Sequence, residues 1–444
     1  MSASLPSAPS VEQLRKQAKD LVRAANEPLK LSEAQRIIAR RYGFPSWPRL
    51  KAYVDRVAEH GPDLQHAYHE DVDYYEGRAH GLLASAQDGT GGAVAAFERR
   101  GAPLTEDGAR AVVAHAHGFA GWEALRRHVV SLRTGGEPFA RAYREIEAHD
   151  VDGLAALIDR FPELVHARGT NDNDLLGMAG ATHDERLVKV LLDRGADPRR
   201  GNAHGWTPLH QAAYSDLPAM ARMLLDAGAQ VDVSARGDGG TPLIVALFWG
   251  NRTTAEVLAD RGVYPRNLRA AAGLGRLDLI AELGPEEASA HRAYYRPHSG
   301  FPAWRPADDP QQVLDEALAW AARNGRDDAV ERLVARGADV AADVYRGTAL
   351  AWAAACGRTA TIRRLVALGA DPNQLTTFGG PGHAQPATAL HLAAQNDDLE
   401  PIRTLLELGA DPTITDGVYH ATPAAWAEHD RRIPARDLLR EHGG

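Results

Sequence analysis

The chain has 444 residues, of which 44% are hydrophobic and 25% are charged, a composition typical of a folded protein and not of a disordered one. Its net charge is −9, and no window of about 18 consecutive apolar residues occurs, so we expect no membrane-spanning segment. A single cysteine, Cys356, excludes an internal disulfide and a zinc site built from several cysteines.

The start of the chain lacks the basic and apolar segments of a signal peptide, so we expect a cytoplasmic protein. Residues 1–60 contain eleven Lys and Arg against six Asp and Glu, so this segment carries +5 and the remainder −14. Ser10 and Ser46 stand directly before amphipathic segments, where a hydroxyl can cap a helix. We therefore predict a basic helical module over 1–60.

Part of this module is repeated further along the chain. The segment EAQRIIARRYGFPSWPRLKAYV at 33–54 is similar to DGARAVVAHAHGFAGWEALRRHV at 107–129. Each contains a helical pattern, a Gly-Phe turn, a tryptophan and a second helical pattern. We therefore predict a second, related helical module over 82–135.

An acidic connector, 61–81, is expected between the two modules. It contains four side chains that can bind metals, namely His66, His69, Glu70 and Asp73. Close spacing on one segment is weak evidence for a metal site. We favour a solvated connector and predict no metal site in the chain.

Basic and aromatic residues alternate near the end of the first module, a pattern that can indicate nucleic-acid binding. The residues are Arg40, Arg41, Arg49 and Lys51 with Tyr42, Phe44 and Trp47. Phe44 and Trp47 also fit the core of the duplicated helix-turn unit, and the whole chain is acidic. We therefore disfavour nucleic acid as a partner.

From residue 138 onward, a motif of about 34 residues recurs. The segments GWTPLHQAAYSDLPAMARMLLDAGAQVD at 205–232 and GGTPLIVALFWGNRTTAEVLADRGVYP at 239–265 place their Thr-Pro pairs 34 residues apart. Related segments begin at 346, 387 and 421. With the more degenerate copies included, we predict nine repeats over 138–444.

Each recurring residue type has a physical role. Threonine at the helix N-cap accepts a bond from a free backbone amide, and the following proline fits the first helical position. Paired alanines such as Ala212 and Ala213 keep the first helix thin, and Leu224 and Leu225 belong to a buried stripe on the second helix. Glycine then ends the second helix. One repeat cannot bury these faces alone, so neighbouring repeats must stack.

This motif resembles the ankyrin repeat, and the resemblance covers about two thirds of the chain. The helical segment ahead of it is similar to one found ahead of ankyrin repeats in some bacterial proteins, so we expect a bacterial source. The resemblance implies an all-α fold: an ankyrin repeat solenoid of helix-turn-helix repeats with short β-hairpin fingers, preceded by a small helical domain. It also implies that His210 and His391 bond to neighbouring backbone.

The repeat pattern is interrupted by two insertions, at 285–311 and at 374–386. The first is rich in aromatic and basic residues, namely His291, Tyr294, Tyr295, Arg296, His298, Trp304 and Arg305. It either fills a gap where one finger is missing or folds over the concave face and contributes to binding. The second insertion extends another finger.

Ankyrin domains usually contact their partners with finger tips and with the exposed end of the first helix. By the resemblance, those positions are His204, Trp206, Tyr214, Phe248, Trp249, Arg323, Asn324, Gln395 and Asn396. Phe248 and Trp249 are adjacent aromatic residues, and aromatic residues are enriched at interfaces. The alternative is that the 285–311 insertion covers these positions.

No established catalytic motif occurs in a suitable context. We therefore predict a non-enzymatic binding protein without a cofactor, which recognises a protein partner through its concave palm and fingers. The alternative is an enzyme or a small-molecule sequestering protein with a pocket between the 285–311 insertion and the concave face. In that case, the candidate catalytic residues are Tyr295, His298 and Asp308.

Overall fold

The computed structural model describes residues 9–25, 28–42, 44, 46–61, 64–133, 136–235, 240–261, 266–284, 309–344, 346–378, 386–396 and 398–444. The chain divides into two compact units, Met1–Pro208 with Ala227–Ala229, and Leu209–Asp226 with Gln230–Gly444. The predicted all-α fold is confirmed: the regular structure of these residues consists of helices, and one isolated antiparallel bridge pairs Thr376 with Ala387.

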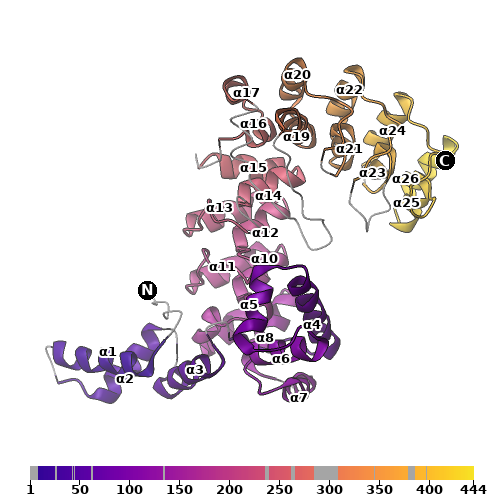
Figure 1. The fold of residues 1–444 in the computed structure, drawn as a ribbon. Coiled ribbons are helices and arrows are strands. Elements are labelled where there is room, and N and C mark those ends of the chain that lie inside the picture. Colours follow the sequence, from indigo (N-terminus) through magenta and orange to yellow (C-terminus); the bar gives the residue numbers. More distant parts are fainter. Residues whose placement is uncertain are drawn as a thin grey trace. The chain divides into compact units, whose positions relative to one another are not determined.

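The first unit begins with three helices that share a small core of their own (Figure 1, indigo). They are α1 (Val11–Ala24), α2 (Leu31–Arg41) and α3 (Trp47–His60). Ser10 caps α1, because its hydroxyl accepts a hydrogen bond from the amide of Gln13 at 3.4 Å. The core of this module is formed by Leu14, Ile38, Leu50 and other apolar residues.

Four further helices form a second core in the same unit, namely α4 (Val72–Gln87), α5 (Gly91–Arg100), α6 (Glu106–Ala116) and α7 (Trp122–Leu132). Residues 75 positions apart occupy equivalent places in the two cores. The pairs Ala34 and Ala109, Ala39 and Ala114, and Leu50 and Leu125 are all fully buried. The duplication in the sequence is therefore a duplication of α2 and α3 as α6 and α7.

The segment between the modules is not the solvated connector that the sequence suggested. Leu64, Ala67 and Tyr68 are buried, and α4 begins within the segment at Val72. The ring of His66 stacks on Phe139 of α8 (Pro138–Glu147), with 5.1 Å between centroids. The expectation is wrong because aromatic burial outweighs the cost of ordering this acidic segment, which joins the second module to the first repeat.

The described residues from Pro138 onward form successive pairs of short helices. In the first unit, these are α8 with α9 (Val151–Arg160), and α10 (Leu175–Ala181) with α11 (Glu185–Asp193); the turns η1 (Pro162–His166) and η2 (Thr170–Asp172) lie between the pairs. Figure 1 labels α8, α10 and α11 among these helices.

In the second unit, seven more helix pairs follow in the described part of the chain. They are α12 (Pro208–Tyr214) with α13 (Pro218–Asp226), α14 (Pro242–Trp249) with α15 (Arg252–Ala259), α16 (Leu268–Leu274) with α17 (Leu277–Glu282), α19 (Pro310–Arg323) with α20 (Asp327–Ala335), α21 (Ala349–Ala355) with α22 (Thr359–Ala367), α23 (Ala389–Ala394) with α24 (Glu400–Glu407), and α25 (Pro423–His429) with α26 (Ile433–Glu441).

A continuous apolar core runs along α16 to α26, with alanine in the first helices and leucine, isoleucine and valine in the second.

Threonine and histidine perform the roles that the repeat pattern predicts. Thr241 and Thr348 cap α14 and α21, because their hydroxyls accept backbone amides at 3.4 and 3.2 Å. The Nε2 atom of His210 donates to the carbonyl of Gly240 at 3.0 Å, and His391 donates in the same way to Ala421 at 3.0 Å. Each buried histidine therefore bonds to the loop that opens the next repeat.

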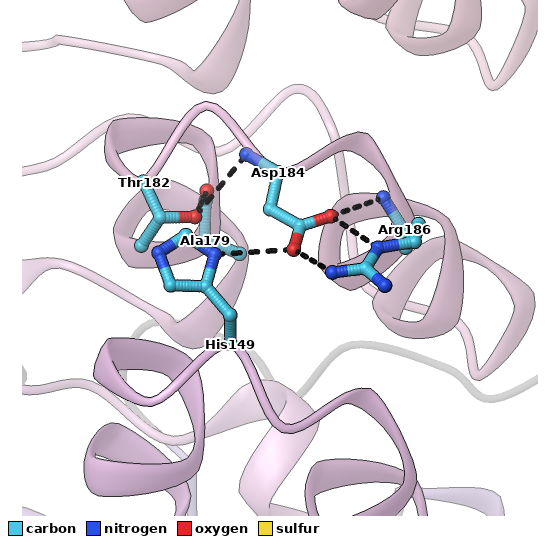
Figure 2. A network of polar contacts seen from close by, with 5 residues as sticks. All are labelled: His149, Ala179, Thr182, Asp184 and Arg186. Atoms are coloured by element: carbon cyan, nitrogen blue, oxygen red, sulfur yellow. Dashed lines mark hydrogen bonds and ion pairs between the residues drawn. The ribbon is translucent and has the colours of Figure 1, made fainter.

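A polar network links adjacent repeats at the start of their second helices (Figure 2). Asp184 accepts from the ring of His149 at 3.1 Å and from the amide and guanidinium of Arg186. These hydrogen bonds, the one from Arg186 above all, hold the pKa of Asp184 well below its usual value. In the second unit, Asp216 accepts from Thr254 at 2.9 Å in an equivalent link. Polar side chains thus fix the register of neighbouring repeats.

We expect His210→Ala to destabilise the second unit by about 3 kcal/mol, because it opens a cavity and removes one of the two hydrogen bonds to the carbonyl of Gly240, which keeps only the amide of Ala235 as a donor. Hydrogen exchange of the amides between 209 and 260 measures this local free energy. His204→Ala is the matched control, since His204 is exposed. Equal protection in the two variants would show that the histidine bond does not stabilise the stack.

A pH dependence follows from His117, which is 2% exposed in the core of the second helical module. Burial, with Arg78 and His66 nearby, lowers the pKa of His117 from 6.5 to about 3. The folded state therefore holds His117 neutral while the unfolded chain binds a proton below pH 6.5, so stability falls as the pH decreases from about 6.5 toward 3.

Hydrogen exchange of α4 and α6 checks this dependence. Between pH 6.5 and roughly 4.5, the original protein should lose amide protection in these helices as the pH falls. We expect this loss to be smaller in His117→Gln, because glutamine does not titrate. A variant with the same pH slope as the original would contradict the assignment.

Candidate functional site

Several of the predicted binding residues lie at the C-terminal ends of first helices in the second unit. We call Tyr214, Trp249, Arg323, Asn324, Gln395 and Asn396 the helix-end row. Tyr214 at the end of α12 is 44% exposed, and Trp249 at the end of α14 is partly buried. Their rings meet edge to face, with 5.5 Å between centroids. This pair offers an aromatic surface with a fixed geometry.

Beneath the aromatic pair lies a buried cluster built around Arg323 of α19. The Cζ atom of Arg323 lies 3.5 Å from the centroid of Trp352, 4.9 Å from that of Phe248 and 5.7 Å from that of Trp320. Its Nη1 atom donates to the carbonyl of Phe248 at 2.7 Å, and its Nε atom donates to the carbonyl of Ala319 at 3.2 Å. Arg323 thus joins α14, α19 and α21.

The expectation that Phe248 and Arg323 are exposed binding positions is therefore wrong. Both side chains are 2% exposed, because a planar guanidinium packs between aromatic rings from neighbouring helices. Trp249 packs edge to face against Phe248, with 5.3 Å between centroids, so the buried cluster contacts the pair formed by Tyr214 and Trp249. These residues position the surface and do not form it.

Asparagines at the helix ends bond to backbone carbonyls of other repeats and, in the case of Asn324, also of the helix that precedes it. Asn324 is fully buried, which corrects its prediction as an exposed residue, and its Nδ2 atom donates to the carbonyls of Leu247 and Trp320, both at 2.9 Å. Asn396, partly buried, donates to the carbonyls of Ala354 and Ala355 at 3.1 and 3.2 Å. These amides satisfy the free carbonyls at helix C-termini.

Asn251 was missed by the sequence analysis, although it makes the corresponding bonds next to the aromatic pair. Its Nδ2 atom donates to the carbonyls of Ala213 and Tyr214 at 2.9 and 2.7 Å. It therefore fixes the backbone that carries Tyr214. The signal in the sequence was an asparagine recurring one or two residues after a first helix, at 251, 324 and 396.

The remaining predicted contact residues lie in separate places. Gln395 is exposed and donates to the carboxylate of Asp430 at 2.8 Å. His204 and Trp206 belong to the first unit, in the loop before α12, where both backbone amides donate to the side chain of Asn202, at 2.9 and 3.1 Å respectively. His204 is exposed and Trp206 is partly buried.

Two charged or reactive groups also lie in the second unit. Arg269 and Glu316 form a buried ion pair, with 3.6 Å between Nη1 and Oε2.

The Sγ atom of Cys356 lies 3.6 Å from the carbonyl oxygen of Trp249, and burial raises the pKa of its thiol. A raised pKa disfavours the nucleophilic thiolate, which fits a packing role for this cysteine.

The first insertion falls almost entirely outside the described residues, which resume at Asp309. His291, Tyr294, Tyr295, Arg296, His298, Trp304, Arg305 and Asp308 are among the residues not described. The pocket predicted between this insertion and the concave face therefore stays a prediction.

In the second insertion, Thr376 and Ala387 close the finger with two backbone hydrogen bonds of 2.9 and 3.0 Å, and residues 379–385 lie outside the described part.

Among the described residues, no group of His, Cys, Asp and Glu is arranged to hold a metal ion. Over the same part of the chain, no helix has the length and apolar character needed to cross a membrane.

The stacked helix pairs, with Thr-capped first helices and histidines that bond to the next repeat, define a helical repeat protein. Family models of the ankyrin repeat match residues 175–267, 304–376 and 387–417. The chain belongs to the ankyrin repeat family, and its fold is an ankyrin solenoid preceded by helices.

Curated relatives share parts of the repeat region. The potassium channel GORK of Arabidopsis thaliana is 33% identical over 145 residues, which are 31% of this chain and 17% of the channel. A TRP cation channel subfamily A member 1 homolog of Caenorhabditis elegans is 34% identical over 142 residues, 32% of this chain and 12% of that protein. Protein PhlB of Serratia liquefaciens is 34% identical over 101 residues, 23% of this chain and 44% of PhlB.

The chain thus spans less than half the length of each of these three relatives. Among solved structures, the human ASB11 ankyrin repeat domain aligns with 61% of this chain and 99% of that domain, at 20% identity and a TM-score of 0.29. The repeat models carry the family assignment.

Arg323→Lys should destabilise the second unit by about 2 kcal/mol, because an ammonium group cannot reproduce the planar stacking and the two carbonyl bonds. Urea unfolding followed by tryptophan fluorescence reports this change, since Trp320 and Trp352 surround the guanidinium. Arg363→Lys, at a half-exposed ion pair with Glu407, is the control. Equal effects of the two substitutions would contradict the structural role given to Arg323.

Proposed function

We propose that this chain is a non-enzymatic binding protein that recognises a protein partner through the exposed part of the helix-end row, chiefly through Tyr214 and Trp249. The observation that carries the proposal is the edge-to-face aromatic pair, of which Tyr214 is 44% exposed. Ankyrin repeats generally mediate protein–protein interaction, which supports this class of function.

The packing of this surface also supports the proposal. Asn251 fixes the backbone under Tyr214, and Phe248 supports the ring of Trp249. A side chain that is already ordered loses little conformational entropy on binding, so more of the contact energy contributes to affinity. Aromatic anchors of this kind often dominate the energy of protein interfaces.

The location of the protein is part of this proposal. We place it in the cytoplasm, with a cytoplasmic protein as its partner. The support is the cysteine content: with Cys356 alone, the chain cannot form the internal disulfides that are common in secreted proteins.

The experiment compares two variants of the full chain as immobilised bait in a lysate of the source organism, with the captured proteins identified by mass spectrometry. We expect the double variant Tyr214→Ala, Trp249→Ala to retain roughly a tenth or less of the specifically captured partner. Tyr419→Ala removes an equally apolar side chain that is 72% exposed at a distant finger, and it should capture as the original does.

Circular dichroism of each bait establishes that it is folded. Undiminished capture by the folded double variant would overturn the proposed surface.

A further inference from the structure

The two N-terminal modules share a core but differ in what covers one face of an equivalent helix. In the second module, Val112 of α6 is 7% exposed and lies in one apolar cluster with Ala93 and Phe97 of α5. The residue 75 positions earlier is Ile37 of α2, which is 40% exposed. The same helix face is therefore covered in one copy and open in the other.

The chain itself explains the difference. Between α4 and α6 it contains the additional helix α5, over Gly91–Arg100. Between α1 and α2 there are only residues 25–30, which are too few to form a covering helix. Among the described residues, the first module thus has no counterpart of α5 over the face of α2 around Ile37.

The open face differs from its covered counterpart in charge as well. Arg36, Arg40 and Arg41 flank Ile37 on α2, and all three side chains are exposed. None of them forms an ion pair with another described residue. The equivalent residues of α6 are Ala111, His115 and Ala116. Because α6 folds in the same way without these charges, the helical module does not require the three arginines.

We propose that this face of α2, with Ile37 at its centre and Arg36, Arg40 and Arg41 around it, binds an acidic amphipathic helix of a partner protein. The helical shape is inferred from α5, which packs against α6 in the second module and shares an apolar cluster with Val112. The apolar side of the partner helix covers Ile37, and its carboxylates meet the guanidinium groups. This second surface lies in the first unit and does not depend on the proposed function of the helix-end row.

An acidic helix fits this face better than nucleic acid does. Phosphate binding requires cations but no apolar centre, whereas Ile37 exposes apolar surface in the middle of the arginines. Nucleic acid and self-association are therefore outcomes of the test and not part of the proposal.

The probe is a synthetic peptide based on α5, with Arg99 and Arg100 replaced by glutamate and with both ends extended by alanine and glutamate so that the isolated helix forms. A peptide of the same length that keeps both arginines and carries lysine extensions is the charge-reversed control. Fluorescence anisotropy with the full 444-residue chain gives the affinity of each peptide. We expect the acidic peptide to bind at least roughly tenfold more tightly than the basic one.

Two sets of variants locate the binding on α2. Ile37→Ala should weaken the acidic peptide about fivefold or more, whereas Val130→Ala, at a similarly exposed valine of α7, should leave its affinity unchanged. The triple reversal Arg36→Glu, Arg40→Glu, Arg41→Glu should abolish binding. The matched reversal of Arg15, Lys16 and Lys19 on α1 changes the net charge equally and should have a much smaller effect.

Circular dichroism verifies that the variants keep their helix content. The proposal is overturned if the acidic peptide does not bind, if both triple reversals weaken it equally, or if Ile37→Ala has no effect. It is also overturned if duplex DNA binds the chain more tightly than the peptide in an Ile37-independent way, or if light scattering shows that a second copy of the chain already covers this face.

Discussion

Every helix pair in the repeat region is too small to bury its own apolar face, so the fold depends on the stacking of each repeat against its neighbours. Apolar contacts supply the driving force, and buried polar side chains set the register. His210 and His391 bond forward to the next repeat, while Asn251 and Asn396 bond back to the previous one. Both kinds of bond end on backbone carbonyls, so they form whatever side chain the accepting residue carries. The side chains at the surface can therefore vary without loss of these bonds.

The same constraint explains the buried cluster around Arg323. Asn324, next in the chain, reaches the carbonyl of Leu247, 77 residues earlier, and Arg323 reaches that of Phe248. These bonds connect α19 directly to α14, although α16 and α17 lie between them in the sequence. A guanidinium that packs against Trp352 and Phe248 holds three first helices together, and Phe248 in turn contacts Trp249, the partly buried partner of the exposed Tyr214.

Local chemistry made much of this fold predictable. The Thr-Pro pairs, the helix-ending glycines and the histidines of the repeat follow from short-range capping and hydrogen bonding, and the structure places them accordingly. Exposure was harder to predict, because whether Phe248 and Arg323 face solvent depends on helices that are distant in the sequence. The aromatic residues of the connector were misread for the same reason: the rings of Tyr68, which is buried, and His66, which is partly buried, pack against Phe139, on a helix about seventy residues away. The duplication could be recognised from the similar sequences of the two modules. That the first module has no described equivalent of α5 became clear only from the different exposure of Ile37 and Val112.

The central claim is that Tyr214 and Trp249 form the surface that meets a protein partner. A photo-reactive phenylalanine analogue at position 214 of the full chain tests this directly, since it forms covalent bonds only to what lies against it. The account predicts crosslinks from position 214 to one protein, and none to that protein from the same analogue at position 419, which is exposed elsewhere. Crosslinks from position 419 alone, or from neither position while the partner is still captured, would contradict it.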